Sequence, residues 1–221
     1  MIKVLFVCHA NKSRSPMAEG IFKKMVDDSG LSEYFLIESR AVSTEMIGSI
    51  PAPETIKRLE SIGASWQGMT AQKISQDDYR NFDFIICMDE KNMTYLKKHA
   101  GIYRDKIYLA LDISHKTKGQ NIPDPYYTGD YDETFKFLMS SLDEWLTMFK
   151  LNKLSKGIDI EDYRISTKPL FLNNQSDYFW NKETKKYELT SCAKSAAMTS
   201  LNRFMKMKNK NENRFLFLLT F

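Results

Sequence analysis

A cysteine and an arginine near the start of the chain have the spacing of a phosphate-binding loop that carries a nucleophile. Cys8 and Arg14 are separated by five residues: His9, Ala10, Asn11, Lys12 and Ser13. Backbone N–H groups at such a turn favour a dianion, and a guanidinium can bind two phosphate oxygens at once. The same positive field favours the thiolate, which is the nucleophilic form of cysteine. The sequence therefore predicts attack of Cys8 on a bound phosphoryl group, with a phosphocysteine intermediate.

The segments on either side of this phosphate loop (residues 8–15) are those expected around a ligand site. Residues 2–7 are mostly apolar and predict a buried strand. Ser15 is expected to cap the following helix, with Pro16 at its first position and Gly30 at its end. The loop would then join the carboxyl end of a strand to the amino end of a helix, where open α/β sheets bind ligands. The alternative, a packing cysteine beside a surface arginine, does not account for these flanking signals.

Two further loop residues suit the same chemistry. The hydroxyl of Ser15 is expected to hydrogen-bond the Cys8 sulfur and to stabilise it as a leaving group. Asn11 tolerates the left-handed backbone angles that a tight anion-binding turn needs.

The first 150 residues alternate predicted strands and helices. Further strands are expected at residues 35–42, 82–88 and 106–110. Helices are expected at 53–62, 90–99 and 134–150. This alternation predicts an α/β fold, a three-layer open sandwich in which a parallel sheet of about four strands has helices on both faces.

These residues resemble the low-molecular-weight protein tyrosine phosphatases, a family with the motif C-x-G-N-x-C-R-S-P after its first strand. The matching positions here are Cys8, Asn11, Arg14, Ser15 and Pro16. Two more family landmarks are present: the stretch Asp124-Pro125-Tyr126-Tyr127, and the strand over residues 84–88 that ends in Met88-Asp89 with Asn92 following. The resemblance covers about residues 1–150, which is the domain length usual in that family.

The resemblance implies a role for each of these positions. Cys8 would be the nucleophile, Arg14 would bind the phosphate and stabilise the transition state, and Asp124 would be the general acid. In a second step the Asp124 carboxylate would activate water. Tyr126 and Tyr127 would form an aromatic wall for the phosphotyrosine ring. No metal and no organic cofactor is implied, and the expected partner is a phosphotyrosine-containing protein.

Four loop positions depart from the family pattern. Ala10 stands where the family usually has glycine. Ser13 replaces a common second cysteine, which in relatives can trap the oxidised nucleophile as a disulfide. His9 and Lys12 are polar where aliphatic residues are common. These two side chains either favour acidic or multiply phosphorylated substrates or point into solvent.

Other functions fit parts of the same pattern. A phosphoarginine or small phosphomonoester phosphatase would use the same loop. An arsenate reductase would need two further cysteines held close together, whereas Cys87 and Cys192 are far apart in the sequence. A non-catalytic phosphate-binding module would explain Ala10 and Ser13, although Cys8, Arg14 and Asp124 are all present.

Cysteine usage and hydropathy predict a reducing, cytoplasmic setting. The three cysteines form no close pair, which argues against a disulfide framework. The chain opens with no secretory pattern, and no stretch approaches the ~18 apolar residues of a membrane-spanning helix.

Residues 151–221 lie outside the resemblance and form a predicted basic extension. They hold 13 lysines and arginines against 7 acidic residues, whereas residues 1–150 hold 19 against 21. A small α+β appendage is expected, with a strand at 163–172, a hairpin pairing 178–180 with 187–189, and a helix at 191–208. The extension is expected to serve as a packing or interaction module, and a membrane surface or a protein is its candidate partner. No recognised motif indicates nucleic acid.

Overall fold

The computed structural model describes residues 1–155, 178–181 and 186–189, with side-chain environments for residues 1–150. The chain divides into two compact units, Met1–Lys156 and Gly157–Phe221. The predicted division at residue 150 stays a prediction. In the second unit, β5 (Tyr178–Asn181) pairs antiparallel with β6 (Lys186–Leu189), as predicted for these segments. The strand predicted at 163–172 and the helix predicted at 191–208 lie outside the described residues.

The first unit is built on a parallel sheet of four strands. These are β1 (Ile2–Cys8), β2 (Phe35–Ala41), β3 (Phe84–Cys87) and β4 (Ile107–Leu109). Their order is β2-β1-β3-β4, and every neighbouring pair is parallel. Because β1 lies inside the sheet, its residues 4–8 are all buried, which explains their apolar run.

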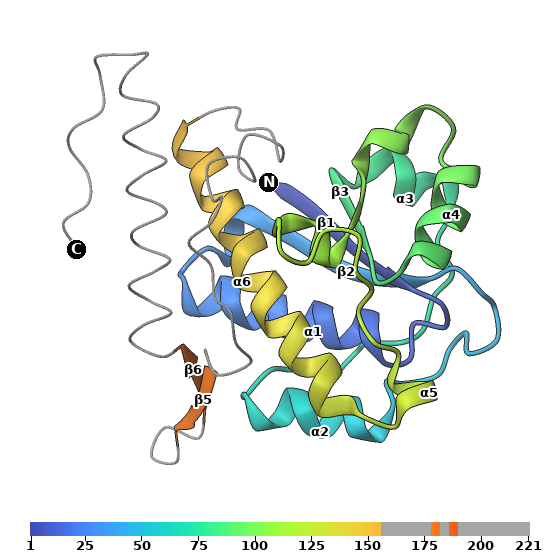
Figure 1. Ribbon diagram of the computed structural model, residues 1–221. Coiled ribbons are helices and arrows are strands. Elements are labelled where there is room, and N and C mark those ends of the chain that lie inside the picture. Colours follow the sequence, from blue (N-terminus) through green and yellow to red (C-terminus); the bar gives the residue numbers. More distant parts are fainter. Residues whose placement is uncertain (156–177, 182–185, 190–221) are drawn as a thin grey trace. The chain divides into compact units, whose positions relative to one another are not determined.

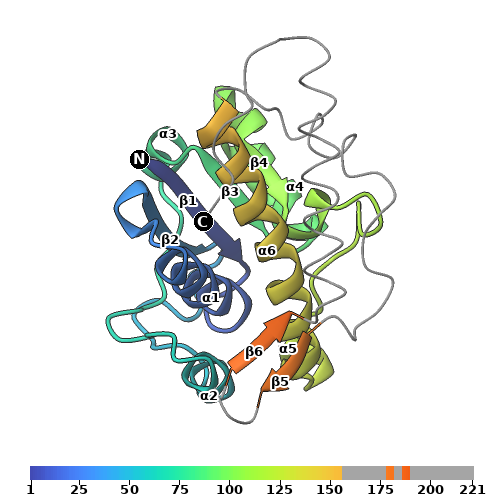
Figure 2. The ribbon, with the colours of Figure 1, turned by 90° about the vertical axis from the view of Figure 1, so that its left-hand side faces the viewer.

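Helices cover both faces of this sheet (Figures 1 and 2). α1 (Arg14–Asp28) and α6 (Tyr131–Ser155) pack on one face, where Phe22 meets Phe149 at 6.0 Å between ring centroids. α3 (Gln76–Asn81) and α4 (Glu90–His99) cover the other. The remaining helices are short: α2 (Pro53–Ser61), α5 (Pro125–Thr128), and the 3-10 helices η1 (Ser32–Tyr34), η2 (Gly101–Lys106) and η3 (Ala110–Ile113). The predicted three-layer α/β sandwich is confirmed.

The alternation of side chains along β1 sorts the core into two parts. Leu5 and Val7 point into a cluster with Cys87 and Leu96, on the side of α3 and α4. Phe6 points to the opposite side and meets Phe22 of α1 at 5.6 Å between ring centroids. Since successive strand residues alternate, Cys8 shares the face of Phe6 at the carboxyl end of the strand.

The predicted start of the first helix is wrong by about half a turn. The helix begins at Arg14, and the residue at the N-cap is Ser13 rather than Ser15. The reason is that the Ser13 carbonyl already accepts the helical hydrogen bond from Met17 N at 3.1 Å. Pro16 still lies in the first turn, where no N–H is needed. The shift leaves the Ser15 hydroxyl free to bond elsewhere.

Among the described residues, no helix combines the length and the apolar character needed to span a bilayer.

Candidate active site

The carbonyl groups of the phosphate loop are bonded to the chain that surrounds it. Cys8 O accepts from Val42 N at 3.0 Å, His9 O from Ser43 N at 2.9 Å, and Lys12 O from Ala52 N at 2.8 Å. In a trans peptide the N–H of the next residue points the opposite way from the carbonyl. The N–H groups that follow these carbonyls therefore point toward the inside of the loop. With the N-terminus of α1 adjacent, this arrangement favours a bound anion.

Asn11 fixes the shape of this loop. Its φ of 53° is the only positive φ of a non-glycine residue in the described part of the chain, which confirms the predicted left-handed turn. The side chain donates to Ser15 Oγ at 2.9 Å and to Ser39 Oγ at 2.8 Å, and it accepts from Gln72 N at 3.0 Å. Ser39 in turn donates to Glu19 at 2.6 Å. Ala10 needs no left-handed angle, so its methyl group causes no backbone strain.

The Cys8 thiol lies at the base of the loop beside Ser15. The two side-chain atoms, Sγ and Oγ, are 3.1 Å apart, and Cys8 is 3% exposed. The Ser15 hydroxyl accepts a hydrogen bond from Asn11, and its own proton can be donated either to the sulfur or to the Arg40 carbonyl, which lies 3.3 Å away. This contact is the one expected from the sequence, and it suits stabilisation of a thiolate.

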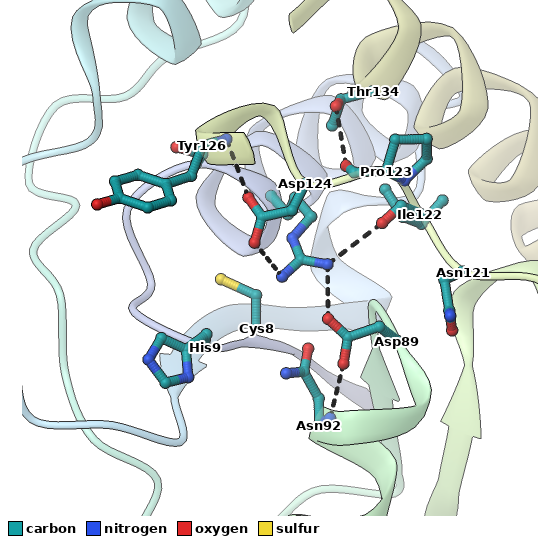
Figure 3. A network of polar contacts seen from close by, with 12 residues as sticks. Cys8, His9, Asp89, Asn92, Asn121, Ile122, Pro123, Asp124, Tyr126 and Thr134 are labelled. Atoms are coloured by element: carbon teal, nitrogen blue, oxygen red, sulfur yellow. Dashed lines mark hydrogen bonds and ion pairs between the residues drawn. The ribbon is translucent and has the colours of Figure 1, made fainter. Parts of the chain in front are cut away.

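Arg14 is buried, and its guanidinium is held by groups from two distant parts of the chain (Figure 3). Nη1 donates to Asp89 Oδ2 at 2.7 Å and to the Ile122 carbonyl at 3.2 Å. Nη2 donates to Asp124 Oδ2 at 2.6 Å. Asp89 also caps α4 by accepting from Asn92 N at 2.7 Å, so its carboxylate is fixed at both oxygens. Asp89 lies just after the carboxyl end of β3, and Asp124 lies in the chain that follows β4.

Asp124 is presented by the first turn of α5. As the N-cap of that helix it accepts from Tyr126 N at 3.2 Å, and Pro125 occupies the first helical position. The preceding residue, Pro123, is tied to α6 because its carbonyl accepts from Thr134 Oγ1 at 3.0 Å. In Figure 3 the Asp124 carboxylate and the Cys8 sulfur face the same space. The side chain is 21% exposed, which leaves it accessible to a substrate.

The two tyrosines that follow Asp124 are exposed rather than packed. Tyr126 is 80% and Tyr127 79% exposed, and their rings meet edge to face at 5.1 Å between centroids. An exposed aromatic pair beside Asp124 is accessible to a substrate ring, and the role that the resemblance implies for this pair stays a prediction.

The two polar loop residues have partners on the neighbouring segment. His9 Nε2 lies 3.2 Å from both carboxylate oxygens of Glu45. Lys12 Nζ donates to the Ile50 carbonyl at 2.6 Å. Neither side chain simply points into solvent. The Ile50 carbonyl carries no charge, so its bond with Lys12 does not neutralise the ammonium group.

Sequence reasoning named Asp89 as a landmark without giving it a role, and it missed Ser39 and Glu19 altogether. Asp89 had a signal, because it directly follows a buried strand and so had to lie at the same sheet edge as Cys8. Ser39 and Glu19 had none, since a serine in an edge strand and a glutamate in a helix are ordinary surface residues. Among the described residues, no group of three or more His, Cys, Asp or Glu side chains could hold a metal ion.

Cys87 is badly placed to react with an oxidised Cys8. It belongs to the α3–α4 side of the sheet, whereas Cys8 belongs to the other side. Burial raises the pKa of the Cys87 thiol well above its usual value, with a further contribution from Asp89, which keeps it in the unreactive protonated form. Cys192 lies outside the described residues.

We therefore expect peroxide to inactivate the chain with poor recovery. After a fixed dose of hydrogen peroxide, dithiothreitol should restore a smaller fraction of activity in the wild type than in Ser13→Cys, which reinstates the second loop cysteine of relatives. Oxidation of Cys8 can otherwise continue to the irreversible sulfinic acid. The measurement is residual phosphatase activity with mass spectrometry of the Cys8 peptide. Equal recovery in the two proteins would contradict the prediction.

Comparison with known proteins agrees with this geometry. The sequence model of a family described as low molecular weight phosphotyrosine protein phosphatase matches residues 3–157. The low molecular weight protein-tyrosine-phosphatase YfkJ of Bacillus subtilis is 35% identical over 154 residues, which are 69% of this chain and 99% of that protein. The low molecular weight phosphotyrosine protein phosphatase of Sus scrofa is 38% identical over 132 residues, covering 58% and 82%.

Solved structures give the same result. The crystal structure of YfkJ from Bacillus subtilis superposes with a TM-score of 0.67 at 35% identity, covering 69% of this chain and 97% of that one. A protein tyrosine phosphatase from Entamoeba histolytica superposes with a TM-score of 0.64 at 26% identity, covering 69% and 99%. The present chain carries its phosphate loop at the carboxyl end of a central parallel strand, and the match covers residues 3–157. The chain therefore belongs to the low-molecular-weight protein tyrosine phosphatase family.

Proposed function

We propose that this chain hydrolyses phosphotyrosine in protein substrates through a phosphocysteine intermediate at Cys8. The proposal is supported by one observation above all. A single buried guanidinium, Arg14, bonds the carboxylate of Asp124 on one nitrogen and is fixed by Asp89 on the other, beside a thiol that touches Ser15. These groups supply a nucleophile, an anion-binding fork and an acid at one sheet edge.

In the first step the Cys8 thiolate attacks phosphorus in line with the phenolic oxygen. The S–P bond forms as the P–O bond breaks, and Arg14 with the loop N–H groups holds the phosphoryl oxygens. The phosphate competes with Asp124 for Nη2 of Arg14. The step needs Asp124 in its protonated form: displaced from Arg14 toward the leaving oxygen, the carboxyl group donates its proton to the phenolate.

In the second step water hydrolyses the phosphocysteine. The Asp124 carboxylate takes a proton from the water as its oxygen attacks phosphorus, and the S–P bond breaks. The Ser15 hydroxyl, 3.1 Å from the sulfur, stabilises the departing thiolate. Inorganic phosphate leaves, and Asp124 has regained its proton. Because Cys8 must stay reduced, we also propose a reducing compartment such as the cytoplasm for this activity.

A comparison of three substrates tests the proposal. The full chain should release phosphate from p-nitrophenyl phosphate and from a phosphotyrosine peptide in the presence of reductant and chelator. A peptide of the same sequence with phosphoarginine should be hydrolysed more slowly, since the exposed Tyr126 and Tyr127 rings suit a flat aromatic group. Malachite green detection of phosphate measures all three. Faster release from phosphoarginine would reassign the substrate, and no release from any of them would refute the enzymatic function.

A further inference from the structure

The backbone that leads to Asp124 is fixed to the sheet and to the phosphate loop. Ile122 N donates to the carbonyl of Met88, the residue after β3, at 2.8 Å. The Ile122 carbonyl accepts from Arg14 Nη1 at 3.2 Å, and the Ile122 side chain is buried. The chain therefore reaches Asp124 from a position that the sheet edge and the arginine of the site determine.

A side-chain bond from α6 fixes the next peptide group. Thr134, in the first turn of α6, donates from Oγ1 to the Pro123 carbonyl at 3.0 Å (Figure 3). The Asp130 carbonyl, 3.2 Å from the same hydroxyl, is a second acceptor within reach. Because a peptide group is planar, the Pro123 carbonyl lies in one plane with the N and Cα atoms of Asp124. The Thr134 hydroxyl thus helps to set the direction in which the Asp124 side chain leaves the backbone.

The turn that carries Thr134 is itself held in place. Thr134 is 0% exposed. Tyr131, in the same turn, reaches the phosphate loop, with 3.5 Å between its Oη and Ser13 Oγ. Asp132 forms an ion pair with Arg58 of α2 at 2.6 Å. The first turn of α6 is therefore connected to the phosphate loop, to α2 and to the peptide that precedes the acid.

A fixed backbone matters here because the Asp124 carboxyl group has two places to occupy. It is bonded to Arg14 Nη2 in this structure, and in the proposed mechanism it moves to the leaving oxygen. With the preceding peptides held, a rotation of the side chain is enough to make this change. Proton donation depends on the distance and direction to the leaving oxygen, and a misplacement of about 1 Å can lower a rate by about 10²-fold.

We propose that Thr134 is a positioning residue for the general acid, which acts through the Pro123 carbonyl and does not touch the substrate. The inference rests on the proposed function and adds a residue that lies outside the motifs around Cys8 and Asp124. It implies that loss of the Thr134 hydroxyl weakens proton donation to the leaving group and leaves the attack by sulfur unaffected.

The test compares two substrates in variants of Thr134, using the full chain and steady-state kinetics. Thr134→Val removes the hydroxyl and nearly keeps the shape of the side chain. Its kcat for phenyl phosphate, whose leaving oxygen needs a proton, should fall about tenfold, which is less than the loss expected without the acid. Its kcat for p-nitrophenyl phosphate should stay within about twofold of the wild type. Thr134→Ser keeps the hydroxyl and should restore the phenyl phosphate rate to within about threefold.

The same substitution in an Asp124→Ala background separates positioning of the acid from general damage to the fold. With no carboxyl group left to position, Thr134→Val should slow phenyl phosphate hydrolysis by less than about a further twofold. An equally large loss in both backgrounds would overturn the proposal. Equal losses for the two substrates, or no rescue by serine, would do the same.

Ser141→Ala is the matched control. Ser141 is also a buried residue of α6, and its hydroxyl donates to the Leu138 carbonyl at 3.3 Å rather than to the acid's peptide. Its removal should leave the ratio of the two rates at the wild-type value.

A second variant keeps the test decisive if Thr134→Val unfolds at the assay temperature. Thr134→Ala removes the same hydroxyl, and alanine has the highest helix propensity. This variant should show the same selective loss on phenyl phosphate, and a wild-type ratio in it would contradict the proposal. If the wild-type chain hydrolyses neither substrate, the proposed function itself fails.

Discussion

Replacing Cys8 by serine is expected to lower the turnover of p-nitrophenyl phosphate by at least about 10³-fold, because a neutral hydroxyl replaces the only nucleophile at the base of the loop. The substitution changes one atom in a site whose shape is set by Asn11 and by backbone hydrogen bonds, so the loop should keep its conformation. The variant should still bind a phosphotyrosine peptide without hydrolysing it. Steady-state kinetics and isothermal titration calorimetry measure the two effects.

Cys87→Ser provides the matched control for this experiment. Cys87 donates to the Tyr108 carbonyl at 3.3 Å, and a serine hydroxyl can make the same bond. The control removes a thiol from the other face of the sheet and should keep the wild-type rate at a temperature where it is folded. Comparable losses in both variants would mean that activity depends on cysteine for reasons other than nucleophilic attack. Turnover that persists in Cys8→Ser would refute the phosphocysteine mechanism.

Replacing Asp124 by alanine is expected to slow hydrolysis by an amount that depends on the leaving group. For phenyl phosphate, whose leaving oxygen needs a proton, the loss should be about 10²- to 10⁴-fold, the range typical of general acid catalysis. For p-nitrophenyl phosphate, whose leaving group is already a stable anion, the loss should be much smaller. The slope of log kcat against leaving-group pKa across a phenol series measures the difference.

The bond between Asp124 and Arg14 adds a second readout to the same variant. Because Asp124 occupies Nη2 of Arg14, phosphate has to displace it. Alanine at this position should therefore leave the inhibition constant for inorganic phosphate unchanged or lower it, whereas a collapsed site would raise it. Asp124→Asn distinguishes the role of Asp124 as an acid from its role as a helix cap. Asparagine also caps helices well but has no acidic proton to transfer. A leaving-group slope equal to that of the wild type in both variants would exclude Asp124 as the acid.

The parts of this molecule that depend on local sequence could be predicted, and the parts that depend on distant pairing could not. The apolar run of β1 and the turn residue Asn11 express backbone preferences that are readable in the chain itself. The helix start was misplaced because Ser15 and Pro16 suit more than one position of a first helical turn. Only the backbone bond from Met17 to Ser13 decides among them.

The side-chain partners within the site could not be predicted from the sequence. The bond between Arg14 and Asp89 joins residues 75 positions apart. The sequence could place both residues at the same sheet edge, but it could not show that they bond to each other. In the same way, Lys12 and His9 were expected either to face a substrate or to point into solvent. Their actual partners lie in the connection between β2 and α2, up to 38 positions away, and could not be read from the phosphate loop.

Because Arg14 bonds residues far along the chain, the site can form only late in synthesis. Arg14 leaves the ribosome well before its partner Asp124, which follows 110 positions later. A nascent chain that already contains the whole loop sequence thus still lacks its proposed proton donor, and one that stops before Asp89 also lacks the carboxylate that bonds the guanidinium. We therefore expect a truncated chain that ends before Asp124 to be inactive, although it contains the complete phosphate loop.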